Sequence, residues 1–365
     1  MSWSHARAGG ALLDASINLE LDLVLTQGIL GASGIDRGCS RGSRSTQSGR
    51  PFGRPLLFYE GEVRVKPFLS IDGQVELLNE RGAQTDEHTA ATLLREGYYS
   101  VINGYKSPFI DEAATKRAGD DRYKAGTRFS DIYELFDFDR HLRETTFRYL
   151  VIIEAEWRTI VAHTFSEAHP AQGDYLLPSN FATRSQYRSN GFKNYDYDLS
   201  GLLEILSAKA RESRHHAIAH YRATHGSVPL WVLSNDLTFG NVEHFYNLMR
   251  PDEQRTVCKR VALATDHATE RSMRLEPKDA ILSLDTLVKA RTMCAHDERL
   301  YCASIGGRRH DTYGMMLRRM RKFLTDDEFG ELVTSVSDLI QGALGREETK
   351  EHVLETMGVG ALVER

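Results

Sequence analysis

Two segments of the chain each place an arginine five residues before a histidine. The first pair is Arg158 and His163, in EAEWRTIVAH, and the second is Arg291 and His296, in KARTMCAHDERLY. Histidine suits general acid–base catalysis near neutral pH, and the arginine guanidinium donates paired hydrogen bonds to phosphate oxygens. Two such pairs around one RNA phosphate would activate the ribose 2′-OH and stabilise the phosphorane without a metal. These four residues are the predicted catalytic set, and the expected products are a 2′,3′-cyclic phosphate and a 5′-OH.

The spacing alone carries little information. With 35 arginines and 14 histidines in the chain, about one such pair is expected by chance. A third pair, Arg211 and His216, lies in a polar stretch and fits that explanation, whereas the other two lie among apolar residues. Five residues also place two side chains about 140° apart on an ideal helix. Each arginine and its histidine can therefore reach one point only at a helix end, at a bulge or across a symmetric interface.

Four neighbouring residues are predicted to support the two pairs. Glu154 precedes Arg158 by four residues, which allows an ion pair that would orient the guanidinium. Thr159 and Thr292 directly follow the two arginines, and Asp297 follows the second histidine, where a helix is expected to end. The alternative for the first pair is a buried structural ion pair beside an unrelated surface histidine.

A basic cluster near the carboxyl end is the predicted contact for the RNA backbone, although a solvated helix face would look the same. It consists of Arg308, Arg309, Arg318, Arg319, Arg321 and Lys322, with Asp311 as the one acid among them. Because the net charge is −5, only such a local patch could attract a polyanion.

Three other groups favour structural roles. The histidines 215, 216, 220 and 225 lack a nearby Cys or carboxylate to complete a zinc site, so we predict no metal and no cofactor. Tyr98, Tyr99 and Tyr105 could stack on bases, but core packing is the simpler interpretation. The acids and arginines of DFDRHLR are expected to form structural ion pairs rather than a metal nuclease site.

Composition indicates an ordinary globular protein, with 27% charged residues. The four cysteines include no CxxC pair, which favours reduced thiols in the cytoplasm. The longest apolar run is interrupted by Glu20 and Asp22, and a bilayer span needs about 20 apolar residues. No membrane association is expected.

Helical periodicity dominates the chain, and we predict an all-α fold. Expected helices cover residues 72–81, 87–96, 129–165 with a kink or break, 198–224, 235–250, 251–264, 278–295, 313–323, 326–344 and 347–357. Residues 111–127 and 170–194 are expected to be loops, 226–233 an extended connector, and 55–65 one short strand. Residues 1–55 are rich in Gly and Ser and are predicted to be a disordered extension. Residues 56–365 then form the functional domain, with motif halves at about 66–166 and 197–345.

An ordered set of sequence blocks resembles a known family. The blocks are KPFLSIDGQVELLNERG, EGYYSVINGYKSPF, ELFDFDRHLRE, IEAEWRTIVAH, VPLWVLSNDLTFGNVEHFY and ARTMCAHDERLY. They are similar to the Abi-like family of bacterial abortive-infection proteins with HEPN-type helical domains. The resemblance implies a HEPN bundle, an RNA-cutting role in phage defence, and in some members neutralisation by a small non-coding RNA. HEPN motifs often carry Asn, Asp or His after the arginine, whereas this chain has Thr159 and Thr292.

Two alternatives remain beside the nuclease. The first is a HEPN module that binds a structured small RNA or a protein partner without cleaving it. The second is a DNA-binding protein, for which we find no helix-turn-helix pattern. If each motif pairs with its own copy, the active form is a homodimer.

Overall fold

The computed structural model describes residues 68–307 and 310–360. Within these ranges the chain is helical, and extended pairing is limited to three isolated bridges, so the all-α prediction is confirmed there. The HEPN subtype stays a prediction. The predicted disordered extension over 1–55 and the strand over 55–65 lie outside the described residues. No helix in the described ranges is long and apolar enough to cross a bilayer.

Connecting segments join the α-helices. One of these segments contains η1 (Tyr99–Asn103), which is a π-helix. The α-helices are α1 (Ile71–Glu80), α2 (Thr89–Glu96), α3 (Glu112–Ala118), α4 (Phe129–Ala168), α5 (Arg184–Ser189), α6 (Tyr195–Glu212), α7 (His216–His225), α8 (Leu230–Leu233), α9 (Phe239–Leu248), α10 (Pro251–Ala264), α11 (Pro277–Ala295), α12 (Tyr313–Met320), α13 (Asp326–Ala343) and α14 (Glu347–Met357).

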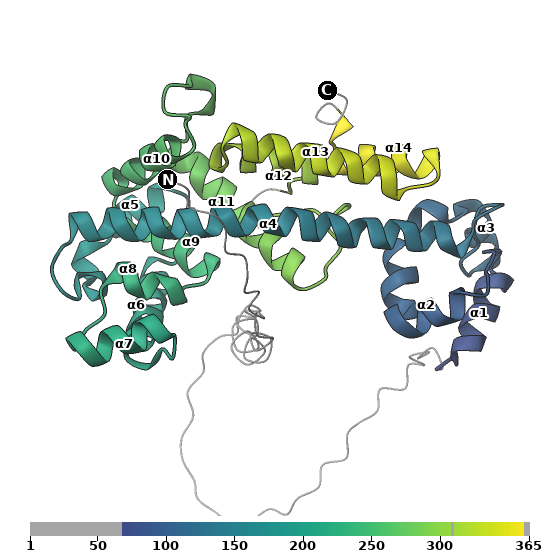
Figure 1. The fold of residues 1–365 in the computed structure, drawn as a ribbon, viewed down its shortest axis with the longest axis horizontal. Helices are drawn as coiled ribbons and strands as arrows, with labels where there is room; N and C mark the ends of the chain where they lie inside the picture. Colours follow the sequence, from purple (N-terminus) through teal and green to yellow (C-terminus); the bar gives the residue numbers. More distant parts are fainter. Residues whose placement is uncertain (1–67, 308–309, 361–365) are drawn as a thin grey trace, which may run out of the picture. The chain divides into compact units, whose positions relative to one another are not determined.

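Helix α4 is the element around which the others pack (Figure 1). It is one continuous helix of 40 residues, so the predicted break is wrong. It contains neither Gly nor Pro, and Arg128 and Asp131 form a capping box at its start. A helix this long would be marginal alone, but α9, α10, α11 and α13 pack against it and bury its apolar positions.

The core is one connected cluster. Trp157 of α4 is 1% exposed and packs edge-on against Tyr246 at 4.8 Å and Phe323 at 5.6 Å between ring centroids. Because Trp157 belongs to the first predicted motif half and its two partners to the second, the halves share this core.

Four predicted segments differ from the structure. The predicted loop over 170–194 contains the short helix α5, which the Thr183 side chain caps. The predicted loop over 111–127 contains α3, a polar helix capped by the Asp111 side chain; polar helices of this length have no apolar period to detect. The predicted connector over 226–233 contains α8, which buries Leu230 and Leu233, three residues apart. The single helix expected over 198–224 is two helices, because residues 213–215 leave the helical conformation.

Burial of an acid beside α13 gives a testable pH effect. Burial, and secondly Glu328, raise the pKa of Glu156 on α4 to about 7, and its Oε1 is buried without a partner. The folded pKa lies above the unfolded value, so stability is lost as pH rises from about 4.5 to 7. Glu156→Gln is expected to remove this loss. At pH 8 its free energy of unfolding should exceed that of the wild type by about 1–2 kcal/mol, whereas at pH 4 the two should be equal. Urea unfolding at both pH values measures the difference. Equal shifts at both pH values would contradict the titration.

Candidate functional site

The structure joins the two predicted motifs through one carboxylate. Glu154 accepts a hydrogen bond from Arg158 Nη2 at 2.8 Å on Oε1, and one from Arg291 Nε at 3.1 Å on Oε2. The first ion pair was expected from the four-residue spacing. The second spans 137 residues of sequence, and no local pattern predicts it. The two arginines therefore lie on either side of a common acid at the contact between α4 and α11.

The arginine pair has the electrostatics of an anion site. The Glu154 side chain is 7% exposed, whereas those of Arg158 and Arg291 are 22% and 34% exposed. Two guanidinium groups share one carboxylate, so one positive charge remains uncompensated within the group. Arg158 Nε is buried without a hydrogen-bond partner, and the Arg291 guanidinium lies 5.5 Å from the Phe147 ring centroid. One phosphate would supply the missing charge and accept hydrogen bonds from the exposed N–H groups of the two arginines.

Contacts at two points show that α11 runs antiparallel to α4. Arg291, near the end of α11, contacts Glu154. Asp297, just beyond that end, contacts Arg143, which lies earlier on α4. As the chain advances along α11, its contacts therefore move toward the start of α4.

This direction separates the two histidines. His163 lies about 14 Å beyond Glu154 toward the end of α4. His296 lies on the other side of Glu154, toward the start of α4, so the two are more than about 14 Å apart along the axis. Both side chains are exposed. His296 is the C-cap of α11, where the helix was expected to end. His163 lines a 360 Å³ pocket with Ser166, Glu167 and Trp231. One chain does not bring both histidines to a single phosphate.

The two threonines have the same local role. Thr159 Oγ1 donates to Ala155 O at 2.9 Å, and Thr292 Oγ1 donates to Val288 O at 3.0 Å. Both hydroxyls therefore bond to the carbonyl four residues earlier in their own helix rather than to the guanidinium of the preceding arginine.

A buried carboxylate positions the segment after α11. Asp139 of α4 is 0% exposed and accepts hydrogen bonds from Tyr105 Oη at 2.7 Å and Arg143 Nη1 at 2.9 Å. It also accepts from the backbone N–H groups of Leu300 and Tyr301. Burial, and secondly the Asp139 charge, raise the pKa of Tyr105, which keeps its hydroxyl a donor.

The ion pair between Asp139 and Arg143 was expected from the sequence, but the contact of Arg143 with the loop after α11 was not. Arg143 also binds Asp297, which has a left-handed backbone with φ of 57°. This conformation is uncommon outside glycine and is held here by the buried pair. Asp297 is thus a positioning residue of the loop, at the site where His296 ends α11.

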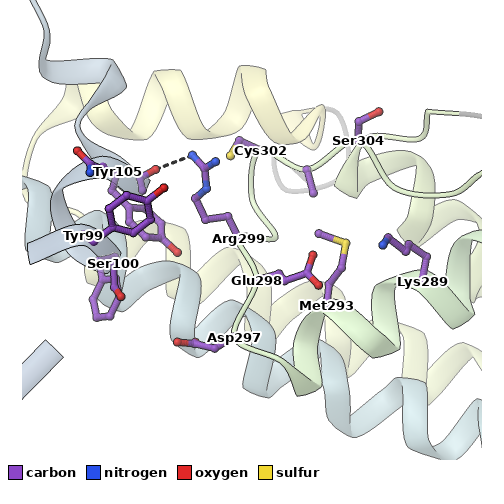
Figure 2. A pocket seen from close by; sticks show the side chains of 14 residues that line it. Tyr99, Ser100, Tyr105, Lys289, Met293, Asp297, Glu298, Arg299, Cys302 and Ser304 are labelled. Carbon is purple, nitrogen blue, oxygen red and sulfur yellow. Dashed lines mark hydrogen bonds between the residues drawn. The ribbon is translucent and has the colours of Figure 1, made fainter. Parts of the chain in front are cut away.

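A pocket of 530 Å³ adjoins this loop (Figure 2). It lies between η1 and the segment after α11, and Arg299 Nη1 bridges the two by donating to Gly104 O at 2.7 Å. Sequence reasoning missed this pocket, because its two walls are about 190 residues apart in the chain. Its lining residues are Tyr99, Ser100, Asn103, Gly104, Tyr105, Phe136, Lys289, Met293, Asp297, Glu298, Arg299, Cys302, Ala303 and Ser304.

The predicted basic cluster is largely paired with acids. Arg319 binds the buried Asp311, Lys322 Nζ lies 3.4 Å from Asp279, and Arg321 lies 4.0 Å from Asp326. Arg318 is exposed, whereas Arg308 and Arg309 lie outside the described residues. Contact of this cluster with RNA stays a prediction.

The remaining groups have structural partners. Tyr98 accepts from Arg81 Nη1 at 3.2 Å, and Tyr105 is buried, so both pack in the fold, while Tyr99 is 80% exposed. Among the described residues, no three His, Cys, Asp or Glu side chains gather as metal ligands. Burial raises the pKa of the Cys294 thiol to about 12, so this residue beside the motif is not a thiolate at neutral pH.

The segment of the chain that matches a known protein family contains most of this site. Residues 91–302 match the model of the family described as Abi-like protein. The match includes η1, all of α4 and all of α11, together with both arginine–histidine pairs. No curated protein and no solved structure matched the chain. Since the matched segment is more than half of the sequence, the chain belongs to the Abi-like protein family.

Proposed function

We propose that this protein is a metal-independent endoribonuclease that acts in phage defence. Family membership suggests a role in abortive infection. The observation that carries the enzymatic proposal is the bridge formed by Glu154, which holds one arginine from each motif at a common site. Such a pair with one uncompensated positive charge fits a phosphodiester.

In the proposed mechanism, Arg158 and Arg291 bind the non-bridging oxygens of the scissile phosphate. The ribose 2′-OH loses its proton to a histidine and attacks the phosphorus, and the 5′ oxygen of the next nucleotide leaves with a proton. The arginines stabilise the charge of the phosphorane, a contribution of several kcal/mol in comparable sites. His296, on the helix that carries Arg291, is proposed for one proton transfer. A homodimer would supply His163 from a second copy for the other, because the two are far apart within one chain.

The alternative is a module that binds a structured small RNA without cleaving it. Two observations favour this alternative: the separation of the histidines, and the threonine hydroxyls that bond to their own helices. In this case the arginine pair would still hold a phosphate, but no proton transfer would follow.

Cleavage in the absence of metal separates the two functions. We expect the purified protein to cleave single-stranded RNA in EDTA, with cyclic phosphate ends. His296→Ala is expected to slow cleavage by about 10²–10⁴-fold, the usual range for general acid–base catalysis. His216→Ala, in the third and polar pair, is the matched control and should cleave as the wild type does.

Loss of wild-type cleavage in EDTA would contradict the proposed mechanism. So would full activity in a variant that lacks both His163 and His296. Tight binding of RNA without any cleavage would favour the binding module.

A further inference from the structure

The pocket beside η1 has the chemistry of a nucleobase site. Its floor is aromatic, because the buried Tyr105 stacks against Tyr301 at 6.0 Å and contacts Phe136 edge-on at 5.4 Å. At the mouth, Tyr99 is 80% exposed. An exposed tyrosine beside an aromatic floor is a surface on which a flat base stacks. The volume of 530 Å³ lies within the usual range for small-ligand pockets.

Polar groups of both kinds line the other end of the pocket, away from Tyr99 (Figure 2). Figure 2 shows Lys289 and Glu298 on either side of Met293, with their charged ends turned toward the pocket. Both side chains are exposed, and neither forms an ion pair with any residue in the described part of the chain. The site therefore presents a free donor and a free acceptor, which are the groups that read a base edge.

The pocket is adjacent to the proposed phosphate site. Helix α11 carries Lys289 and Met293 into the pocket and Arg291 to Glu154. His296 ends the same helix and is followed at once by Asp297 and Glu298, which line the pocket. An RNA strand with its phosphate on the arginine pair would therefore reach the pocket by passing the end of α11, beside His296.

We propose that this pocket binds two neighbouring unpaired bases of the RNA, one stacked on Tyr99 and the other read by Lys289 and Glu298. This inference rests on the proposed function and adds a specificity site to it. Guanine matches the two charged groups best. Its N1–H and N2–H₂ donors can bond to the Glu298 carboxylate, while its O6 accepts from the Lys289 ammonium. Adenine offers one donor at that edge and no oxygen acceptor. A free guanine nucleotide has the same edge, so the test includes it.

The test measures, in EDTA, the binding of labelled 2′-O-methyl oligonucleotides. Their methylated 2′ oxygens cannot attack the phosphate, so these strands are not cleaved. Each oligonucleotide is uridine-rich and carries a single guanine, a single adenine or neither. We expect the wild type to prefer the guanine strand. Tyr99→Ala should weaken binding of that strand about tenfold, as loss of one stacked base does. Tyr99→Phe should bind the strand as the wild type does, because the ring is kept.

Two further variants complete the design. Tyr197→Ala removes a tyrosine of nearly equal exposure, 79%, far along the chain on α6, and should bind as the wild type does. Glu298→Gln should reduce the preference for guanine over adenine, because the amide replaces one acceptor with a donor. Guanosine monophosphate, offered alone, shows whether the pocket takes a free nucleotide.

Each outcome decides one of the two proposals. Binding of the strand that ignores Tyr99 and Glu298 but requires Arg291 would overturn the base pocket and leave the proposed function standing. Glu298-dependent binding of the monophosphate without binding of RNA would support the pocket, assign it to a free nucleotide and overturn the proposed function. Binding of neither probe would overturn both.

Discussion

Asp139→Asn is expected to lower the free energy of unfolding by about 3–5 kcal/mol, the range for removing one partner of a buried ion pair. Asp139 accepts hydrogen bonds from Tyr105, from Arg143 and from two backbone N–H groups in the segment after α11. An asparagine amide would turn its NH₂ group toward some of these donors and leave them unsatisfied. The midpoint of urea unfolding measures the change.

Asp137→Asn is the matched control, two residues earlier on the same helix. Its side chain is 39% exposed and lies 3.7 Å from Arg140, so its loss should cost less than about 1 kcal/mol. If both variants unfold at the same urea concentration, Asp139 does not anchor the loop after α11. A large shift for Asp139→Asn alone would show that the buried carboxylate holds α4 and this loop together.

Arg291→Ala is expected to reduce RNA cleavage by about 10²–10³-fold, the cost of removing one donor from a transition-state oxyanion. Arg158→Ala should act similarly, because both guanidinium groups are proposed to bind one phosphate. Arg291→Lys should recover only part of the activity, since the ammonium cannot form the paired hydrogen bonds of a guanidinium. Single-turnover rates in EDTA measure these effects.

Arg148→Ala controls for the loss of a positive charge on α4. Its side chain is 70% exposed, and its nearest acid, Glu331, is 4.0 Å away. This variant should cleave RNA at the wild-type rate. Equal losses for Arg148→Ala and Arg291→Ala would mean that general positive charge, rather than the arginine pair, drives the reaction.

Local signals explain which parts of the fold could be predicted. The bounds of α10 and α14 match the predicted 251–264 and 347–357, because Pro251 begins the first helix and Gly358 ends the second. The ion pair of Glu154 with Arg158 was also local, being four residues apart on one helix. By contrast, α8 has four residues, about one helical turn, which is too short for an apolar pattern to repeat.

The register of α4 against α11 could not be read from the sequence. That register decides that Glu154 meets Arg291 and that Asp139 meets the backbone of Leu300 and Tyr301. It also places the two histidines on opposite sides of the arginine pair. Tertiary pairing similarly gives Lys322 its acid, Asp279, although residues 318–322 (RRMRK) contain no acid. Charge clusters read from sequence therefore overstate the free charge on a surface.

The most direct test asks whether the two arginines bind the same phosphate. Neutral methylphosphonates would be placed, one position at a time, in a 2′-O-methyl strand that the wild type binds. Loss of the phosphate charge should weaken wild-type binding at one position by about 10–100-fold, the value of a charge-assisted contact. At that same position, Arg158→Ala and Arg291→Ala should cause no further loss. The two variants could instead become insensitive to the methylphosphonate at different positions, or at no position. In either case the two arginines do not share a phosphate, and the site built on Glu154 is not the RNA site.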